Sequence, residues 1–224
     1  MAELVTLDLG RAAYEPTLRL QERLRDDVKA AADERAYLIL VEHDPPVITL
    51  GRGARAAHVT ASRRRLAREG VEVHESARGG DVTYHGPGQL VAYPILRLDL
   101  HGRDVRRYLR DLEEVLIRVL ARLGVEGTRA EGLTGVWVGP EKVAAIGVAI
   151  SRWVTWHGVA VNVDTNLDHF GLIVPCGIPG RGVTSLSRLL GRPMTVAEVK
   201  PLLVEYVVEV FGFSGARPGD VPVA

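Results

Sequence analysis

The chain has 224 residues, of which 46% are hydrophobic and 25% charged, and its 28 basic residues balance 28 acidic ones. This composition is typical of a soluble globular protein. With no net charge, the chain lacks the excess of positive charge that is typical of a general nucleic-acid or anionic-membrane binder. No apolar run approaches the roughly 20 residues of a membrane-spanning helix, and the N-terminus does not resemble a signal peptide. We therefore expect one continuous core over residues 1–224, with neither nucleic acid nor membrane as a partner.

Cysteine and lysine are rare in this chain, and arginine supplies most of the positive charge. The chain has one cysteine, Cys176, and three lysines, Lys29, Lys142 and Lys200. A single cysteine cannot form an intramolecular disulfide, which agrees with a reducing compartment. We therefore expect a cytoplasmic location.

In chain order, leucines and Val28 at helical spacing predict a helix from Tyr14 to about residue 33. The β-rich runs 36–43 and 47–51 follow, separated by the rigid bend Asp44-Pro45-Pro46. The basic run 62–65 is typical of a solvated helix face, because a phosphate-binding surface usually clusters more charge.

Residues 71–75 and 89–96 are predicted strands on either side of a glycine-rich segment. The strongest helical periodicity in the chain covers residues 104–123, and Gly124 follows as a plausible stop. Three further strands are predicted at 136–139, 142–150 and 157–163. Their connections are too short for crossover helices, so we expect antiparallel pairing.

A capping-box pattern at Thr195 and Glu198 opens a last helix that runs toward Phe211. The tail at 212–224 is predicted to be irregular. Strands grouped in the middle of the chain, with helices before, between and after them, indicate an α+β fold in which helices pack against a mainly antiparallel or mixed sheet.

The glycine-rich segment 78–89 is the first candidate site. Its glycines allow the backbone to approach a ligand closely, and Arg78, Thr83 and His85 add polar groups. A purely structural loop is an equally good interpretation. The segment lacks the Lys-Ser/Thr ending of a phosphate-binding loop, so nucleotide binding does not follow from its glycines.

Cys176 is the second candidate, because it lies between Pro175 and Gly177 rather than within a regular apolar element. This context favours a functional thiol at a corner of the chain, although buried and inert cysteines are common. A metal site is not expected, since no second cysteine or closely spaced histidine pair could complete it.

A cysteine nucleophile needs a base, and His85, His157 and Lys142 are the candidates. Lys142 opens an apolar strand, where desolvation favours the neutral amine. Arginine cannot give up a proton, so a position that requires proton transfer would keep lysine in this arginine-rich chain. The alternative is an ordinary exposed lysine at a strand end. We expect His157 and His43 to have packing or surface roles.

Four segments, taken together, resemble one enzyme family. They are RGGDVTYHGPGQLVAYPI, GVWVGPEKVAAIGV, WHGVAVNV and DHFGLIVPCGIPGRGVTSL, and they occur in the order found in the lipoyl(octanoyl) transferases. The resemblance covers most of residues 36–190. It departs from the family at Val161, where leucine is expected, and in the sequence Gly180-Arg181-Gly182 after the cysteine.

The resemblance implies a single catalytic domain with the α+β fold of lipoate-protein and biotin-protein ligases. It also implies an acyltransferase that moves an octanoyl group from acyl carrier protein to a lysine of a lipoyl domain, without ATP or another cofactor and without a metal. The acceptors would be the lipoyl domains of 2-oxoacid dehydrogenase complexes and the glycine cleavage H protein.

By the same resemblance, Cys176 would carry the acyl group as a thioester and Lys142 would act as its proton-transfer partner. The family's substrate contacts map onto three segments: Arg78, Gly79, Gly80, Asp81, Val82, Thr83, Tyr84 and His85; Ala145, Ile146 and Gly147; and Gly158, Val159 and Ala160. Three alternatives stay open: an ATP-dependent lipoate-protein ligase, which would not need Cys176, a thioester hydrolase, and a non-catalytic module that binds carrier or lipoyl domains.

Overall fold

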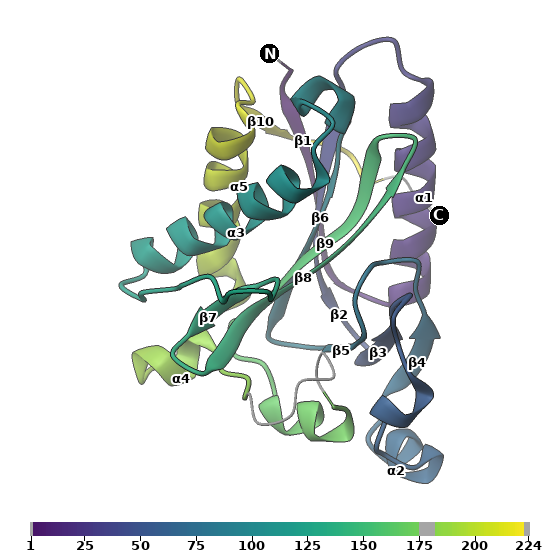
Figure 1. Cartoon of the computed structure of the whole chain (residues 1–224), viewed down its shortest axis with the longest axis vertical. Helices are drawn as coiled ribbons and strands as arrows, with labels where there is room; N and C mark the ends of the chain where they lie inside the picture. The colour runs from purple at the N-terminus through teal and green to yellow at the C-terminus, as the bar shows by residue number, and fades with distance from the viewer. Residues whose placement is uncertain (1, 175–181, 222–224) are drawn as a thin grey trace.

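The computed structural model of the protein describes residues 2–174 and 182–221. Two sheets and the helices packed on them make up the fold (Figure 1). The strands are β1 (Leu4–Ala12), β2 (Ala36–His43), β3 (Val47–Leu50), β4 (Glu72–Glu75), β5 (Val82–His85), β6 (Gln89–Ile95), β7 (Val136–Val138), β8 (Glu141–Ser151), β9 (Val154–Asn162) and β10 (Ala216–Pro218). The α-helices are α1 (Tyr14–Ala30), α2 (Arg63–Arg68), α3 (Val105–Arg122), α4 (Leu186–Leu190) and α5 (Val196–Phe211), and short 3₁₀ helices cover Ala56–His58, Leu98–His101 and Leu167–Leu172.

The larger sheet has seven strands in the order β10-β1-β2-β6-β9-β8-β7. The pairs that β1 makes with β10 and with β2 are parallel, and the other four pairs are antiparallel. The smaller sheet has the order β4-β3-β5, with one parallel and one antiparallel pair. The predicted α+β class with a mainly antiparallel or mixed sheet is therefore confirmed, as is the antiparallel pairing of β7, β8 and β9.

Helices cover both faces of the larger sheet. Helices α3 and α5 pack together against one face, and α1 packs against the other (Figure 1). A third apolar cluster, which includes Ile48, Tyr84 and Leu172, joins the smaller sheet to the segment Leu167–Leu172. None of the helices in the described part of the chain combines the length and the apolar character that a bilayer crossing requires.

Local side-chain and backbone chemistry explains where α3 begins and ends and where α5 begins. The Asp104 carboxylate caps α3 by accepting hydrogen bonds from the backbone N–H groups of Arg106 and Arg107, and Gly124 follows the helix with a φ of 81°. At the start of α5, Thr195 and Glu198 form the predicted capping box.

Three strands were not predicted. β1 lies before the first predicted helix, and its pairing partner β2 is far away in sequence. The tail is not irregular throughout, because Ala216–Pro218 pairs with β1 as β10, beside a hydrogen bond from the Leu4 N–H to the Gly215 carbonyl (2.9 Å). The glycine-rich segment contains the short strand β5, which pairs with β3.

Candidate active site

A cavity of about 230 Å³ lies between the two sheets. Its walls come from the loop before β5, β5 itself, the central strands β6, β8 and β9, and the loop before β7. Thirteen of the fourteen predicted substrate contacts line it: Arg78, Gly79, Gly80, Asp81, Val82, Thr83, His85, Ala145, Ile146, Gly147, Gly158, Val159 and Ala160. Lys142 lines the same cavity. The fold thus brings three separate predicted segments together around one space.

Tyr84 is the exception among the predicted contacts. Successive side chains of a strand point to opposite faces, so Thr83 and His85 face the cavity while Tyr84 points away from it. Its ring packs edge-on against Phe170, and its hydroxyl lies 2.8 Å from Nδ1 of His169. Burial raises the pKa of Tyr84 to about 12. Tyr84 therefore anchors the smaller sheet and does not line the cavity wall.

Arg78 braces the loop that forms one wall. Its guanidinium donates hydrogen bonds to the Thr49 hydroxyl (2.8 and 3.1 Å), to the Thr49 carbonyl (2.7 Å) and to the Gly79 carbonyl (3.0 Å). The Gly79 N–H donates to the Val148 carbonyl on β8 (2.8 Å). The Arg78 side chain also explains why position 147 is a glycine, since a Cβ at that position would lie 2.9 Å from Arg78 Cδ. Glycine at 147 thus makes room for a side chain of the protein itself.

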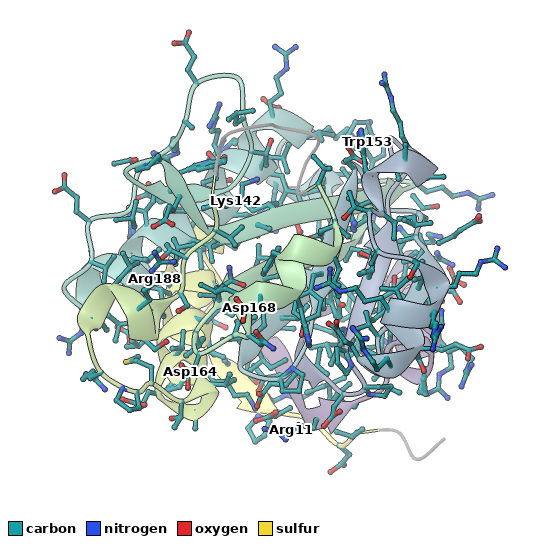
Figure 2. All side chains as sticks on the ribbon, turned by 90° about the horizontal axis from the view of Figure 1, so that it is seen from below. Arg11, Lys142, Trp153, Asp164, Asp168 and Arg188 are labelled. Carbon is teal, nitrogen blue, oxygen red and sulfur yellow. The ribbon has the colours of Figure 1, made fainter. Side chains whose placement is uncertain are left out.

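Lys142 lies near the start of β8 and is 8% exposed. Its backbone N–H donates to the Gly182 carbonyl, and its own carbonyl accepts from the Thr184 N–H, each at 3.0 Å. Its Nζ lies 4.7 Å from the centre of the Trp137 ring. Figure 2 shows Lys142 and, nearby, Arg188, whose guanidinium lies 3.7 Å from the carboxylate of Glu141. Backbone pairing on both sides fixes the position of this lysine.

A buried carboxylate holds the loop that covers the Lys142 side chain. Glu113 on α3 is 1% exposed and accepts hydrogen bonds from Arg110 (2.6 Å), from Arg129 (3.2 Å) and from the Gly135 N–H (3.2 Å). Gly135 has a φ of 119°, and a Cβ there would lie 2.6 Å from the Ala144 carbonyl and 3.4 Å from Lys142 Cε. The loop and β8 therefore approach each other closely enough to require glycine at this position.

Cys176 lies outside the described residues, as do Gly180 and Arg181. The neighbouring residues on both sides are described. The Val174 N–H donates to the His58 carbonyl (2.7 Å), and the Gly182 carbonyl accepts from the Lys142 N–H. The described chain therefore resumes directly beside Lys142.

His85, one of the predicted bases, is held as a neutral imidazole. Burial, together with the positive charge that His43 would carry, lowers its pKa to about 3. His85 Nδ1 lies 2.7 Å from Gln89 Oε1, and the Gln89 amide nitrogen donates to Asn162 Oδ1 (2.9 Å). Because the Gln89 oxygen can only accept a hydrogen bond, His85 Nδ1 must donate it; Nδ1 of the neutral ring therefore carries the proton and Nε2 does not. His85 therefore offers an acceptor and no positive charge.

Several wall residues were not predicted as site residues. They are Tyr14, Thr49, Val91, Tyr93, Gly132, Leu133 and Thr134. His157, which was considered as a base and then expected to have a packing or surface role, is both buried and part of the wall. His43 packs behind the wall, with Nε2 2.7 Å from the Tyr93 hydroxyl. The sequence signals were weak, since single aromatic residues on separate elements form no local motif.

The buried histidines make stability depend on pH. Burial lowers the pKa of His43 to about 4 and of His85 and His157 to about 3, whereas a histidine in an unfolded chain binds a proton near pH 6.5. Between these pH values the unfolded chain binds more protons than the folded chain, so the free energy of unfolding rises with pH. The stability that the neutral histidines allow is lost progressively as the pH falls below about 6.5. Each histidine contributes up to about 1.4 kcal/mol per pH unit.

We therefore expect urea unfolding to give a clearly lower free energy of unfolding at pH 5 than at pH 7.5. His43→Gln removes one of the three groups, and the slope of stability against pH should be shallower in this variant whatever its absolute stability. Equal stability of the wild-type chain at the two pH values would contradict these buried neutral histidines.

Solved structures share this architecture. A bipartite lipoate protein ligase from Thermoplasma acidophilum matches 98% of this chain and 88% of its own, with a TM-score of 0.79 and 17% identity. Lipoate-protein ligase A bound with ATP matches 98% and 89%, with a TM-score of 0.76 and 16% identity. Biotin protein ligase from Aquifex aeolicus in complex with biotin and ATP has a TM-score of 0.55 and 13% identity over 95% of this chain and 71% of its own. The fold is therefore that of the lipoate and biotin ligase catalytic domains.

Sequence relatives narrow the class. The family model of the lipoyl protein ligase A/B catalytic domain matches residues 13–208. An octanoyltransferase from Chloroflexus aggregans is 50% identical over 214 residues, which are 94% of this chain and 96% of the relative. One from Myxococcus xanthus is 49% identical over 217 residues, 94% of this chain, and this chain spans 60% of its length. The chain belongs to the octanoyltransferase family, and the predicted acyltransferase class is confirmed.

Proposed function

We propose that the chain is a single catalytic domain that transfers an octanoyl group from acyl carrier protein to a specific lysine of a lipoyl domain, through a thioester on Cys176. The observation that carries the proposal is the cavity itself. Three segments singled out by the resemblance line one space, and Lys142 lies in its wall. The acceptors would be the lipoyl domains of 2-oxoacid dehydrogenase complexes and the glycine cleavage H protein. A reduced thiol suits a cytoplasmic location.

In the first step, Lys142 Nζ accepts the proton of the Cys176 thiol, and the thiolate attacks the carbonyl carbon of the octanoyl thioester. The tetrahedral intermediate collapses as the bond to the carrier's phosphopantetheine sulfur breaks. The protonated Lys142 then returns its proton to that leaving sulfur. One thioester replaces another, so this step is nearly balanced in energy.

In the second step, the ε-amine of the acceptor lysine attacks the acyl-enzyme, and Lys142 accepts its proton. Cys176 leaves as the thiolate and recovers the proton, which restores both groups. The new amide is more stable than the thioester it replaces, so this step drives the transfer forward.

Both steps pass through an oxyanion, and backbone N–H groups are the proposed donors. Several donors of the glycine-rich segment are already used within the fold, among them the Gly88 N–H, which bonds the Glu42 carboxylate. The Gly79 N–H bonds the Val148 carbonyl, and the Val82 N–H bonds the Asp81 side chain at 2.8 Å. We therefore expect the donors to come from other residues of this segment or from the segment that contains Cys176.

The cavity wall suits an alkyl chain. Its lining includes the apolar residues Ala145, Ile146, Val159 and Ala160. An acyl chain of eight carbons would bury its apolar area against them. The proposed substrate contacts are the thirteen residues of the predicted set that line the cavity.

The test is transfer without ATP. The purified chain is incubated with octanoyl carrier protein and a lipoyl domain, and intact-mass spectrometry follows both proteins. We expect one octanoyl group on the chain when the acceptor is omitted and on the lipoyl domain when it is present. Transfer that requires ATP would favour a lipoate-protein ligase, release of free octanoate faster than transfer would favour a thioester hydrolase, and binding without any acyl transfer would favour a non-catalytic module.

A further inference from the structure

Four arginines near the smaller sheet are exposed. Arg52 and Arg55 lie in the loop after β3, and Arg63 and Arg64 begin α2. Among the described residues, none of the four has a carboxylate oxygen within ion-pair distance. Their neighbours Arg65 and Arg68, by contrast, both face Glu69. We call these four residues the arginine surface.

The segment that carries the arginine surface is bonded to the cavity wall. The Arg52 N–H donates to the Arg78 carbonyl (2.9 Å), and the Gly53 N–H donates to the Gly80 carbonyl (3.0 Å). Arg78 and Gly80 both line the cavity. The loop with Arg52 and Arg55 is therefore the outer layer of that wall.

The same segment also contacts the chain just before the cysteine. The N–H groups of Thr60 and Ala61 donate to the Leu172 carbonyl (3.0 and 3.1 Å), and the His58 carbonyl accepts from Val174. These bonds place α2 beside the part of the chain that leads to Cys176. The arginine surface thus borders two components of the proposed active site.

The other basic stretch of the sequence, on α3, differs from the arginine surface both in its ion pairing and in its position. Three of its five arginines are ion-paired: Arg107 with Asp111 (3.7 Å), Arg110 with Glu113 (2.6 Å) and Arg118 with Glu114 (2.9 Å). Helix α3 packs on one face of the larger sheet, and α2 lies beside the smaller sheet at the lower right of Figure 1. The three paired arginines are therefore partly neutralised, and α3 lies away from the arginine surface.

We propose that the arginine surface, Arg52, Arg55, Arg63 and Arg64, is the docking site of the acyl-donor protein, through a face of that protein that is rich in carboxylates. The proposal rests on the proposed function, because it assigns the donor's binding site. Four exposed guanidinium groups without carboxylate partners contribute little to stability, and in a chain with no net charge they form a local positive field. Such a field speeds encounter with a partner of opposite charge and fixes its orientation.

The test compares a large and a small donor. In the variant Arg63→Glu/Arg64→Glu, we expect the KM for octanoyl carrier protein to rise by about tenfold or more at low salt, with kcat unchanged. The KM for octanoyl-pantetheine, which has no protein surface, should stay at the wild-type value. The wild-type KM for carrier protein should itself rise with salt.

The matched control is Arg106→Glu/Arg122→Glu, which makes the same charge change at exposed positions of α3. We expect wild-type KM values for both donors. An equal rise in the control would overturn the proposal, because net charge alone would then explain it. A rise in the KM for the lipoyl domain instead of the carrier protein would also overturn it and would assign the surface to the acceptor. Failure of the wild-type chain to use either donor would instead refute the proposed function.

Discussion

Replacing Cys176 with alanine is expected to abolish octanoyl transfer together with the covalent adduct on the chain. Loss of an enzyme nucleophile lowers turnover by on the order of 10³ to 10⁶-fold. Because Cys176 is the only cysteine in the sequence, no other thiol of the chain can carry the thioester. Intact-mass spectrometry after incubation with octanoyl carrier protein should show one octanoyl group on the wild-type chain and none on Cys176→Ala.

The control for this result is Cys176→Ser, which replaces the thiol with a hydroxyl of similar size. A serine ester would form slowly, because a hydroxyl is much harder to ionise than a thiol, and it would leave less readily. We therefore expect a weak adduct that accumulates over long incubation. Thermal unfolding of both variants checks that they are folded. An octanoyl adduct that persists in Cys176→Ala would mean that another side chain is the nucleophile.

The helices and central strands could be predicted because their signals are local. α3 repeats apolar residues every three or four positions, and the strands 142–150 and 157–163 are nearly continuous apolar runs. β1 and β10 depend on pairing between Leu4 and Ala36 and between Leu4 and Ala216. Such long-range pairs leave no local pattern. Consequently the sequence indicated the middle of the sheet and missed one edge.

The site likewise contains residues that local sequence motifs indicate and residues that only the tertiary fold brings there. Most residues of the segments that carry a local motif, 78–85 and 145–147, line the cavity. Tyr14 and Tyr93 reach that wall from α1 and β6, which only the tertiary fold brings together. The resemblance made Tyr84 a substrate contact because it lies inside a motif, and the two-residue period of β5 turns its side chain away from the cavity. A motif therefore indicates which segment reaches a site, and strand geometry decides which of its side chains face it.

Two of the glycines among the predicted substrate contacts, Gly147 and Gly158, also serve the packing of the wall itself. In the structure, a Cβ at Gly147 would meet the Arg78 side chain, and one at Gly158 would lie 2.2 Å from the Ala92 carbonyl. These two glycines allow the wall to close tightly. The open volume lies between the wall segments that they hold together.

Replacing Lys142 with arginine is expected to lower turnover by about 10² to 10⁴-fold, the usual contribution of a positioned general base. The guanidinium keeps the positive charge, but it cannot accept the proton of the thiol or of the incoming amine. The matched controls are Lys29→Arg and Lys200→Arg. Those two lysines pair with Asp26 and Asp8 at the surface, away from the cavity wall, and arginine can keep both ion pairs. Both controls should therefore transfer the octanoyl group at the wild-type rate.

The pH dependence of Lys142→Arg separates a proton-transfer role from a structural one. A thiol that lacks an internal base ionises near pH 8.5, so hydroxide can replace the missing base as the pH rises. We therefore expect single-turnover formation of the acyl-enzyme in Lys142→Arg to recover progressively between pH 7 and pH 9, while the wild-type rate changes much less. A packing defect around Trp137 and Gly135 would instead slow the reaction by the same factor at every pH. Turnover close to wild type in Lys142→Arg at pH 7 would refute the base role, because the position would then need charge and not proton transfer.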